Sequence, residues 1–105
     1  MDKKKSLIKN LRNFKSSLNH EIPIEKMIFF GSRATGKPHS WSDIDLIVVS
    51  KEFQAKKFRY RPIGFYKHWN LDYPVDFLCY TPEEFNKLKK QITIVKEAVE
   101  NGIEI

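Results

Sequence analysis

Residues suited to binding phosphate and metal are concentrated in one segment of the chain, from Gly31 to Leu46. The segment opens with Gly31 and Ser32, which directly follow the apolar run 27–30. A strand that ends in glycine and serine and leads into a helix can turn backbone N–H groups toward an anion, and the serine hydroxyl adds a donor. We therefore predict a phosphate-binding turn at Gly31 and Ser32.

Two carboxylates follow the turn, at Asp43 and Asp45, where a predicted strand over 43–49 begins. Side chains two residues apart on a strand project from the same face, with Cα atoms roughly 6 to 7 Å apart. Magnesium prefers a few carboxylate oxygens together with water and triphosphate oxygens, and two such ions can activate an attacking oxygen and stabilise departing pyrophosphate. The spacing therefore favours phosphoryl-type transfer with two Mg²⁺ ions.

A third carboxylate would complete such a site, and Asp76 is the best candidate because it interrupts the apolar run 75–80. A buried lone carboxylate costs several kcal/mol unless it has a cation or hydrogen-bond partners. A metal would be such a partner, and Asp76 could then help deprotonate the acceptor hydroxyl. The alternatives are a salt bridge at Asp76, or Asp72 as the third carboxylate, although Asp72 precedes Tyr73-Pro74 and is expected in a loop.

Two further polar residues of the segment are predicted to bind the nucleotide. Arg33 could contact phosphate, or it could pair with a surface carboxylate. Ser42 could position the nucleotide, or it could cap the turn before Asp43. The residue types leave both alternatives open.

The elements that must position these residues follow from the hydrophobic pattern. Apolar side chains spaced by three and four predict a helix over 3–19. Short apolar runs predict strands over 27–30, 43–49 and 75–80. Together with the helices described next, they predict an α/β (α+β) fold with a small mixed sheet flanked by helices.

The C-terminal third has strong helix signals. Thr81 can cap a helix, Pro82 suits its first position, and Glu84 can complete a capping box. Apolar residues continue at helical spacing up to Val99, with a break expected near 91–93. Asn101-Gly102 should end the helix, and a short edge strand over 103–105 could follow.

The segment 51–73 mixes basic and aromatic residues and predicts a loop followed by a helix around 61–70. Its content is compatible with three roles: nucleic-acid binding by stacking and charge, a helix whose aromatics pack on the sheet, and a docking face for a protein. The sequence does not separate these three.

Composition limits the class of protein. The 105 residues fit one domain over 1–105, and 41% hydrophobic and 30% charged residues exclude a disordered chain. A net charge of +6 favours anionic partners.

A single cysteine, Cys79, excludes an intrachain disulfide and a cysteine-based zinc cluster, and its apolar neighbours predict that it is buried. We find no membrane-spanning stretch or signal peptide and expect a cytoplasmic protein.

The pattern of these residues resembles a known family. Gly31-Ser32, the later Gly36, Ser42-Asp43-Ile44-Asp45-Leu46 and a third aspartate on a following strand are similar to the DNA polymerase β-type nucleotidyltransferase superfamily. The Arg33 and Gly36 positions and the chain length resemble its minimal nucleotidyltransferase branch. The resemblance implies that Gly31 and Ser32 hold the triphosphate of ATP, that Asp43 and Asp45 bind Mg²⁺, and that Asp76 is the third catalytic carboxylate.

The same resemblance implies a biological role. Many minimal members are similar to antitoxins of HEPN-fold ribonucleases, and some transfer AMP from ATP to tyrosines of the toxin. We therefore expect transfer of AMP to a partner-protein hydroxyl. Two alternatives stay open: the same chemistry on RNA or a small molecule, and a catalytically silent module that neutralises its partner by binding alone.

Overall fold

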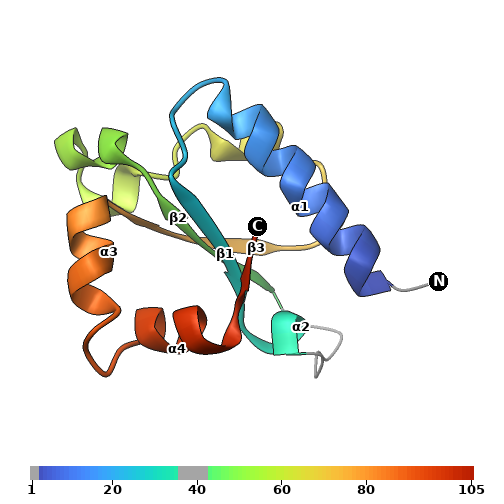
Figure 1. The fold of residues 1–105 in the computed structure, drawn as a ribbon. Coiled ribbons are helices and arrows are strands. Elements are labelled where there is room, and N and C mark those ends of the chain that lie inside the picture. The colour runs from blue at the N-terminus through green and yellow to red at the C-terminus, as the bar shows by residue number, and fades with distance from the viewer. Residues whose placement is uncertain (1–2, 36–42) are drawn as a thin grey trace.

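A four-stranded mixed sheet forms the centre of the computed structural model, which describes residues 3–35 and 43–105 (Figure 1). Its strand order is β3-β2-β1-β4. Strand β1 is antiparallel to both β2 and β4, whereas β2 and β3 are parallel. The strands span β1 Lys26–Phe30, β2 Ile44–Val49, β3 Val75–Tyr80 and β4 Ile103–Glu104. The predicted mixed sheet and its short C-terminal strand are confirmed.

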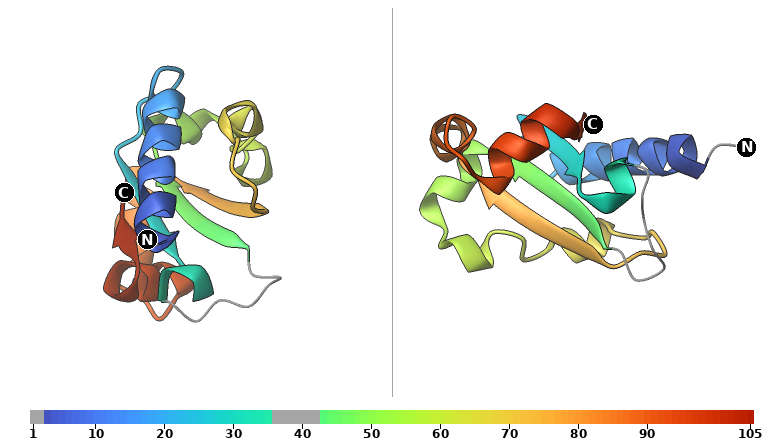
Figure 2. Two further views of the ribbon diagram at one scale, coloured as in Figure 1. Left: turned by 90° about the vertical axis from the view of Figure 1, so that its right-hand side faces the viewer. Right: turned by 90° about the horizontal axis from the view of Figure 1, so that it is seen from below.

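Helices cover both faces of this sheet (Figures 1 and 2). Helix α1 (Lys3–Asn19) packs on one face, against alternate strand residues that include Phe29 and Leu46. Helices α3 (Pro82–Leu88) and α4 (Ile94–Asn101) lie on the other face, against Ile28 and Ile47 among others. Because successive strand residues point to opposite faces, the apolar runs of β1 and β2 supply both cores at once.

The residues predicted to cap the helix after β3 form the expected capping hydrogen bonds. Thr81 and Glu84 form a capping box at the start of α3, with Pro82 in the first turn. Residues 89–93 separate α3 from α4, and Thr93 caps α4 through a hydrogen bond from the Lys96 N–H. The break predicted near 91–93 is therefore confirmed.

The single helix predicted around 61–70 is wrong. The chain instead forms three short 3₁₀ helices, η1 (Lys51–Ala55), η2 (Phe58–Tyr60) and η3 (Phe65–His68). Pro62 lacks an N–H donor, and Gly64 has a φ of 92°, in the left-handed region that a helix cannot include. These two residues interrupt the helical path between η2 and η3.

Part of the aromatic content of this segment is packed in the core. Phe65 contacts Phe77 edge to face with ring centroids 5.2 Å apart, and Trp69 packs in the same way on Phe14 at 5.0 Å. Other aromatics stay accessible, among them Phe58 and Tyr60, which are 47% and 44% exposed. Packing of aromatics on the sheet is therefore confirmed for Phe65 and Trp69, which both contact Phe77 of β3, although the helix that this interpretation assumed is absent from 61–70. The role of the exposed aromatics stays open.

Cys79 is buried in β3, as predicted. Burial raises the pKa of its thiol to about 12, so the group stays protonated at neutral pH. No helix in the described ranges has both the length and the hydropathy that crossing a membrane requires.

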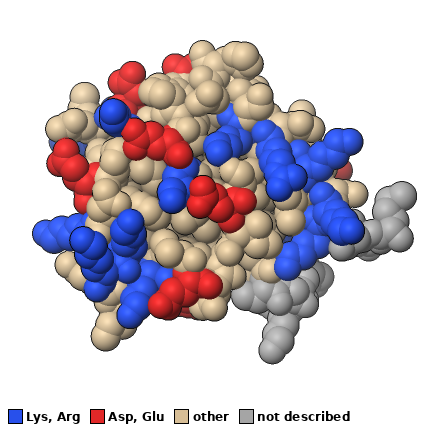
Figure 3. Space-filling view, viewed as in Figure 1, with Lys and Arg blue, Asp and Glu red and all other residues tan. Residues whose placement is uncertain are grey.

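Lysine and arginine side chains do not form one continuous surface on the face shown in Figure 3. They gather over α1 and near the connection between α3 and α4, with acidic side chains between these groups (Figure 3). The basic side chains on this face are therefore distributed over several elements.

Arg61 connects the 3₁₀ segment to β3 and α3. Its side chain is 7% exposed and pairs with Glu84, Nη1 to Oε1 at 2.6 Å and Nη2 to Oε2 at 3.2 Å. The guanidinium also donates to the carbonyl oxygens of Lys56 and Cys79. Each of the donors named here thus has a partner, which is the condition for burying an arginine at low cost.

Replacing Glu84 by glutamine should destabilise the fold, because a buried guanidinium would lose its anionic partner. We expect a loss of about 1 to 2 kcal/mol in the free energy of unfolding, below the range for fully buried pairs because the Glu84 side chain is 43% exposed. Urea unfolding measures this loss in the free energy of unfolding. Glu83→Gln, at the exposed neighbouring position, is the charge-matched control. Equal effects of the two substitutions would contradict the role assigned to Arg61.

The stabilisation by Glu84 should also depend on pH. The hydrogen bond from Arg61 lowers the pKa of Glu84, and this effect outweighs burial, which raises it. A carboxyl whose folded pKa is lowered stabilises the fold above its unfolded pKa and loses that contribution as pH falls through the folded pKa. The difference between the wild type and Glu84→Gln should therefore narrow in acid.

Candidate active site

Two of the predicted carboxylates lie side by side on the sheet. Asp45 is the register partner of Asp76 on the parallel strand β3 and of Phe30 on β1. Neighbouring strands are about 4.8 Å apart, and register partners project from the same face. Asp45 shares its face with Ile47, which packs in the core under α3 and α4, so both carboxylates belong to that face.

Asp43 lies next to this pair but not on the strand. Strand β2 begins at Ile44, so the prediction of a strand that includes Asp43 is wrong by one residue. Asp43 is exposed, whereas Asp45 is half-buried. The pKa of Asp45 is raised, first because burial disfavours its charged form and then because the charges of Asp76 and Asp43 repel it. Asp45 therefore lies close enough to both other carboxylates for their charges to act on it.

This cluster has the chemistry of a divalent-cation site. In the described parts of the chain, no lysine or arginine forms an ion pair with Asp43, Asp45 or Asp76. Those parts also contain no ready-made cage of three or more metal ligands. Magnesium suits such an open arrangement, because it commonly binds one or two carboxylates and takes its remaining ligands from water and substrate phosphates. The residues present therefore fit the predicted metal.

Asp76 does not pay the cost of burial that a carboxylate within an apolar run could have, because it is exposed. Asp76 is the second residue of β3, which is an edge strand of the sheet. A carboxylate at this edge is accessible to a reacting group that arrives from solvent. Asp72, the alternative third carboxylate, is exposed in the loop before β3 and lies outside the row formed by Phe30, Asp45 and Asp76.

Gly31 is held against Asp45 by the backbone. Its φ is 86°, and a Cβ added at this position would overlap Oδ2 of Asp45 and lie 3.2 Å from Cγ. Only glycine adopts this conformation readily and leaves room for the carboxylate. Ser32 follows as the first residue of the short helix α2 (Ser32–Thr35). The predicted phosphate-binding turn and the predicted metal ligand Asp45 are thus neighbours.

The two further residues predicted to bind the nucleotide are Arg33 and Ser42, and the structure describes only Arg33. Arg33 places its guanidinium over the ring of Tyr73, with Cζ 4.5 Å from the centroid. This cation–π contact ties α2 to the loop before β3, and a phosphate-binding role for Arg33 stays a prediction. Ser42 lies outside the residues that the structure describes.

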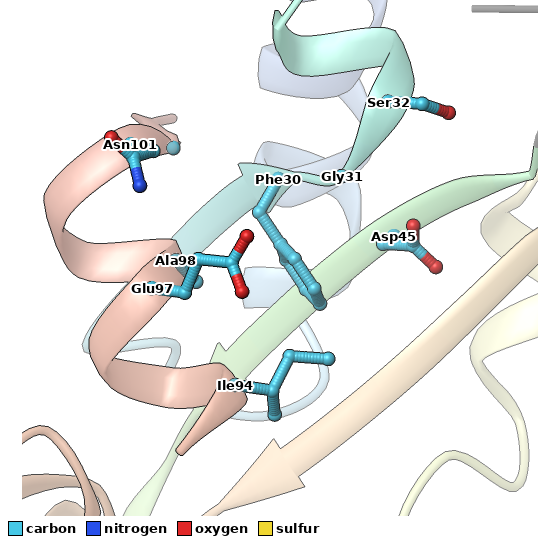
Figure 4. A pocket seen from close by; sticks show the side chains of 9 residues that line it. Phe30, Gly31, Ser32, Asp45, Ile94, Glu97, Ala98 and Asn101 are labelled. Carbon is cyan, nitrogen blue, oxygen red and sulfur yellow. The ribbon is translucent and has the colours of Figure 1, made fainter. Parts of the chain in front are cut away.

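A pocket of about 280 Å³ opens beside Asp45 (Figure 4). The turn at Gly31 and Ser32 forms one side of it, and α4 forms the other. Three of the lining residues, Ile94, Glu97 and Asn101, were not among the residues predicted from sequence. Their signal in the sequence is the spacing 94, 97, 98 and 101, which defines one side of a helix.

Comparison with known proteins identifies the family. The model of the nucleotidyltransferase domain family matches residues 9–101. A protein of Haemophilus influenzae, named "Probable protein adenylyltransferase MntA", is 29% identical over 92 residues, which cover 86% of this chain and 81% of that protein. A crystal structure from Sulfolobus solfataricus, described as a nucleotidyltransferase, superposes with a TM-score of 0.67 at 20% identity, covering 96% of this chain and 80% of that one.

The structural similarity supports the fold, and the family match covers most of the chain. The predicted nucleotidyltransferase family is confirmed by the family match, and the relative from Haemophilus influenzae supports it. The chain belongs to the nucleotidyltransferase domain family and is a minimal nucleotidyltransferase.

Proposed function

We propose that this enzyme transfers AMP from ATP to a tyrosine hydroxyl of a HEPN-type partner protein and acts as its antitoxin. The observation that carries the chemistry is the row of Asp45 and Asp76 beside the glycine turn at Gly31. The choice of a protein acceptor is supported by the similarity to a protein named as an adenylyltransferase.

The residues have separate roles in this proposal. Gly31 and Ser32 bind the triphosphate, with Arg33 and Ser42 as further nucleotide-binding residues. Asp43, Asp45 and Asp76 hold Mg²⁺, which when bound supplies charge stabilisation for the departing pyrophosphate and lowers the pKa of the attacking hydroxyl.

Transfer forms a bond between the acceptor oxygen and the α-phosphorus and breaks the bond from that phosphorus to the bridging oxygen of pyrophosphate. Asp76 takes the proton of the acceptor hydroxyl as general base, which is the part a positioned carboxylate plays in such reactions. Its exposure on the edge strand supports this role, because a tyrosine on the surface of a folded partner can reach it without entering an enclosed cavity.

The test is transfer of label from α-labelled ATP, with Mg²⁺, to the protein that co-purifies with this enzyme. We expect label on a partner tyrosine, and none with the Asp43→Ala, Asp45→Ala double variant. Label on added RNA in place of the partner would support the same chemistry on nucleic acid. Absence of label with any nucleotide, while enzyme and partner still bind each other, would leave a silent binding module.

A further inference from the structure

Helix α4 presents one continuous wall to the pocket beside Asp45. Ile94, Glu97, Ala98 and Asn101 all line this pocket and lie on one side of the helix. Gly102, directly after α4, allows the chain to lie close against β1. A Cβ at this position would lie 2.8 Å from Ile28 Cγ2 and 2.9 Å from the Phe29 carbonyl oxygen. Close packing on β1 therefore holds α4 at a set distance from the glycine turn.

The pocket is apolar at its base and polar at two points of its α4 wall. Phe30 and Ile94 supply the apolar surface, and Ile94 is 51% exposed despite its hydrophobic side chain. Figure 4 shows the Glu97 carboxylate directed from α4 toward Phe30, on the side of the pocket opposite Ser32. An apolar cavity with a few fixed polar groups is typical of sites that bind an organic ring system.

Size and charge narrow the kind of ligand. The volume of about 280 Å³ lies just below the ~300 to 1,000 Å³ of pockets that enclose a whole small molecule, so this pocket suits part of one. Glu97 is an acceptor and carries a negative charge, which disfavours a second phosphate-binding surface on the α4 wall. The wall instead favours a neutral ring that carries N–H donors.

We propose that this pocket binds the nucleobase of the nucleotide and that Glu97 and Asn101 select adenine. The inference rests on the proposed function, because the triphosphate must lie at Gly31 and Ser32 for the base to reach α4. Adenine offers an amino donor next to a ring-nitrogen acceptor, and an asparagine amide can satisfy both at once. Guanine and uracil place a carbonyl oxygen where adenine has its amino group, and the Glu97 carboxylate repels that oxygen.

The test measures nucleotide selectivity rather than activity alone. Equilibrium dialysis with labelled ATP and labelled GTP, each with Mg²⁺, gives the ratio of the two dissociation constants for the wild type, Glu97→Gln and Asn101→Ala. We expect the preference for ATP to fall by at least about five-fold in each variant, the lower end of what one paired base contact contributes. Glu100→Gln is the matched control, since it makes the same change on α4 at a residue outside the pocket lining.

The outcomes separate this inference from the proposed function. An unchanged ATP-to-GTP ratio in both variants overturns the nucleobase subsite, and so does an equal weakening of both nucleotides, which would indicate a general or structural role. The same dialysis remains decisive if no acceptor becomes labelled in the transfer assay. That result would remove the proposed acceptor but leave the selectivity of the pocket measurable.

Discussion

Asp45→Asn is expected to lose at least about a hundred-fold in nucleotidyl transfer while its fold becomes more stable. Asparagine keeps the shape of the side chain but removes the charge that would hold Mg²⁺. Metal stabilisation of transition-state charge contributes several kcal/mol, and about 1.4 kcal/mol corresponds to a factor of ten in rate. The measurement is the rate of label transfer at saturating ATP and acceptor.

The gain in stability, measured without metal, follows from the electrostatics of the three carboxylates. Burial and the charges of Asp76 and Asp43 raise the pKa of Asp45, so its ionised form costs free energy in the folded state. Because the folded pKa lies above the unfolded one, this cost is full at neutral pH, decreases as pH falls through the folded pKa, and disappears below the unfolded pKa. Thermal melts with chelator present should therefore show the largest difference between variant and wild type near neutral pH.

Asp72→Asn is the control for both measurements, since it removes the same charge at an exposed loop position outside the row. We expect it to leave transfer and melting temperature close to those of the wild type. Chelator is needed in the melts, because metal bound only to the folded wild type would stabilise it by mass action. If Asp45→Asn transferred AMP at the wild-type rate, Asp45 would not be a ligand of the metal.

The elements that the sequence predicted well are those with local causes. The capping box at Thr81 and Glu84 needs only residues three apart, and it forms as expected. The run 75–80 forms β3 with the predicted bounds, because a short apolar run between Pro74 and Thr81 has few alternatives. The sequence also indicates that Asp45 and Asp76 belong to one site, because each is a carboxylate within an otherwise apolar strand.

The features that were missed depend on contacts between distant segments. The order β3-β2-β1-β4 places Asp76 on an edge strand, and no local pattern distinguishes an edge from a centre. The wall of α4 faces Asp45 only because α4 packs on β1, so Glu97 and Asn101 looked like ordinary helix residues. The helix predicted around 61–70 does not form, because Pro62 lacks an N–H donor and Gly64 has a φ of 92°.

Gly31→Ala tests whether the glycine turn and the metal ligand are coupled. The left-handed backbone at Gly31 should cost roughly 1 to 2 kcal/mol of stability with any Cβ. The added Cβ also overlaps Oδ2 of Asp45, and the carboxylate can escape only by turning away from its position in the row. Misplacing a catalytic group by about 1 Å can cost roughly a hundred-fold in rate, so we expect a loss of transfer on that order.

Gly64→Ala separates the two effects, because Gly64 has a φ of 92° but no atom within 4 Å of an added Cβ. It should show the same backbone cost in urea unfolding and transfer AMP at nearly the wild-type rate. In an Asp45→Ala background the overlap is removed, so Gly31→Ala should cost less stability there than in the wild type, which is the sign of a direct contact in a double-mutant cycle. Equal costs in the two backgrounds, with transfer preserved in Gly31→Ala, would show that the turn and the carboxylate act independently.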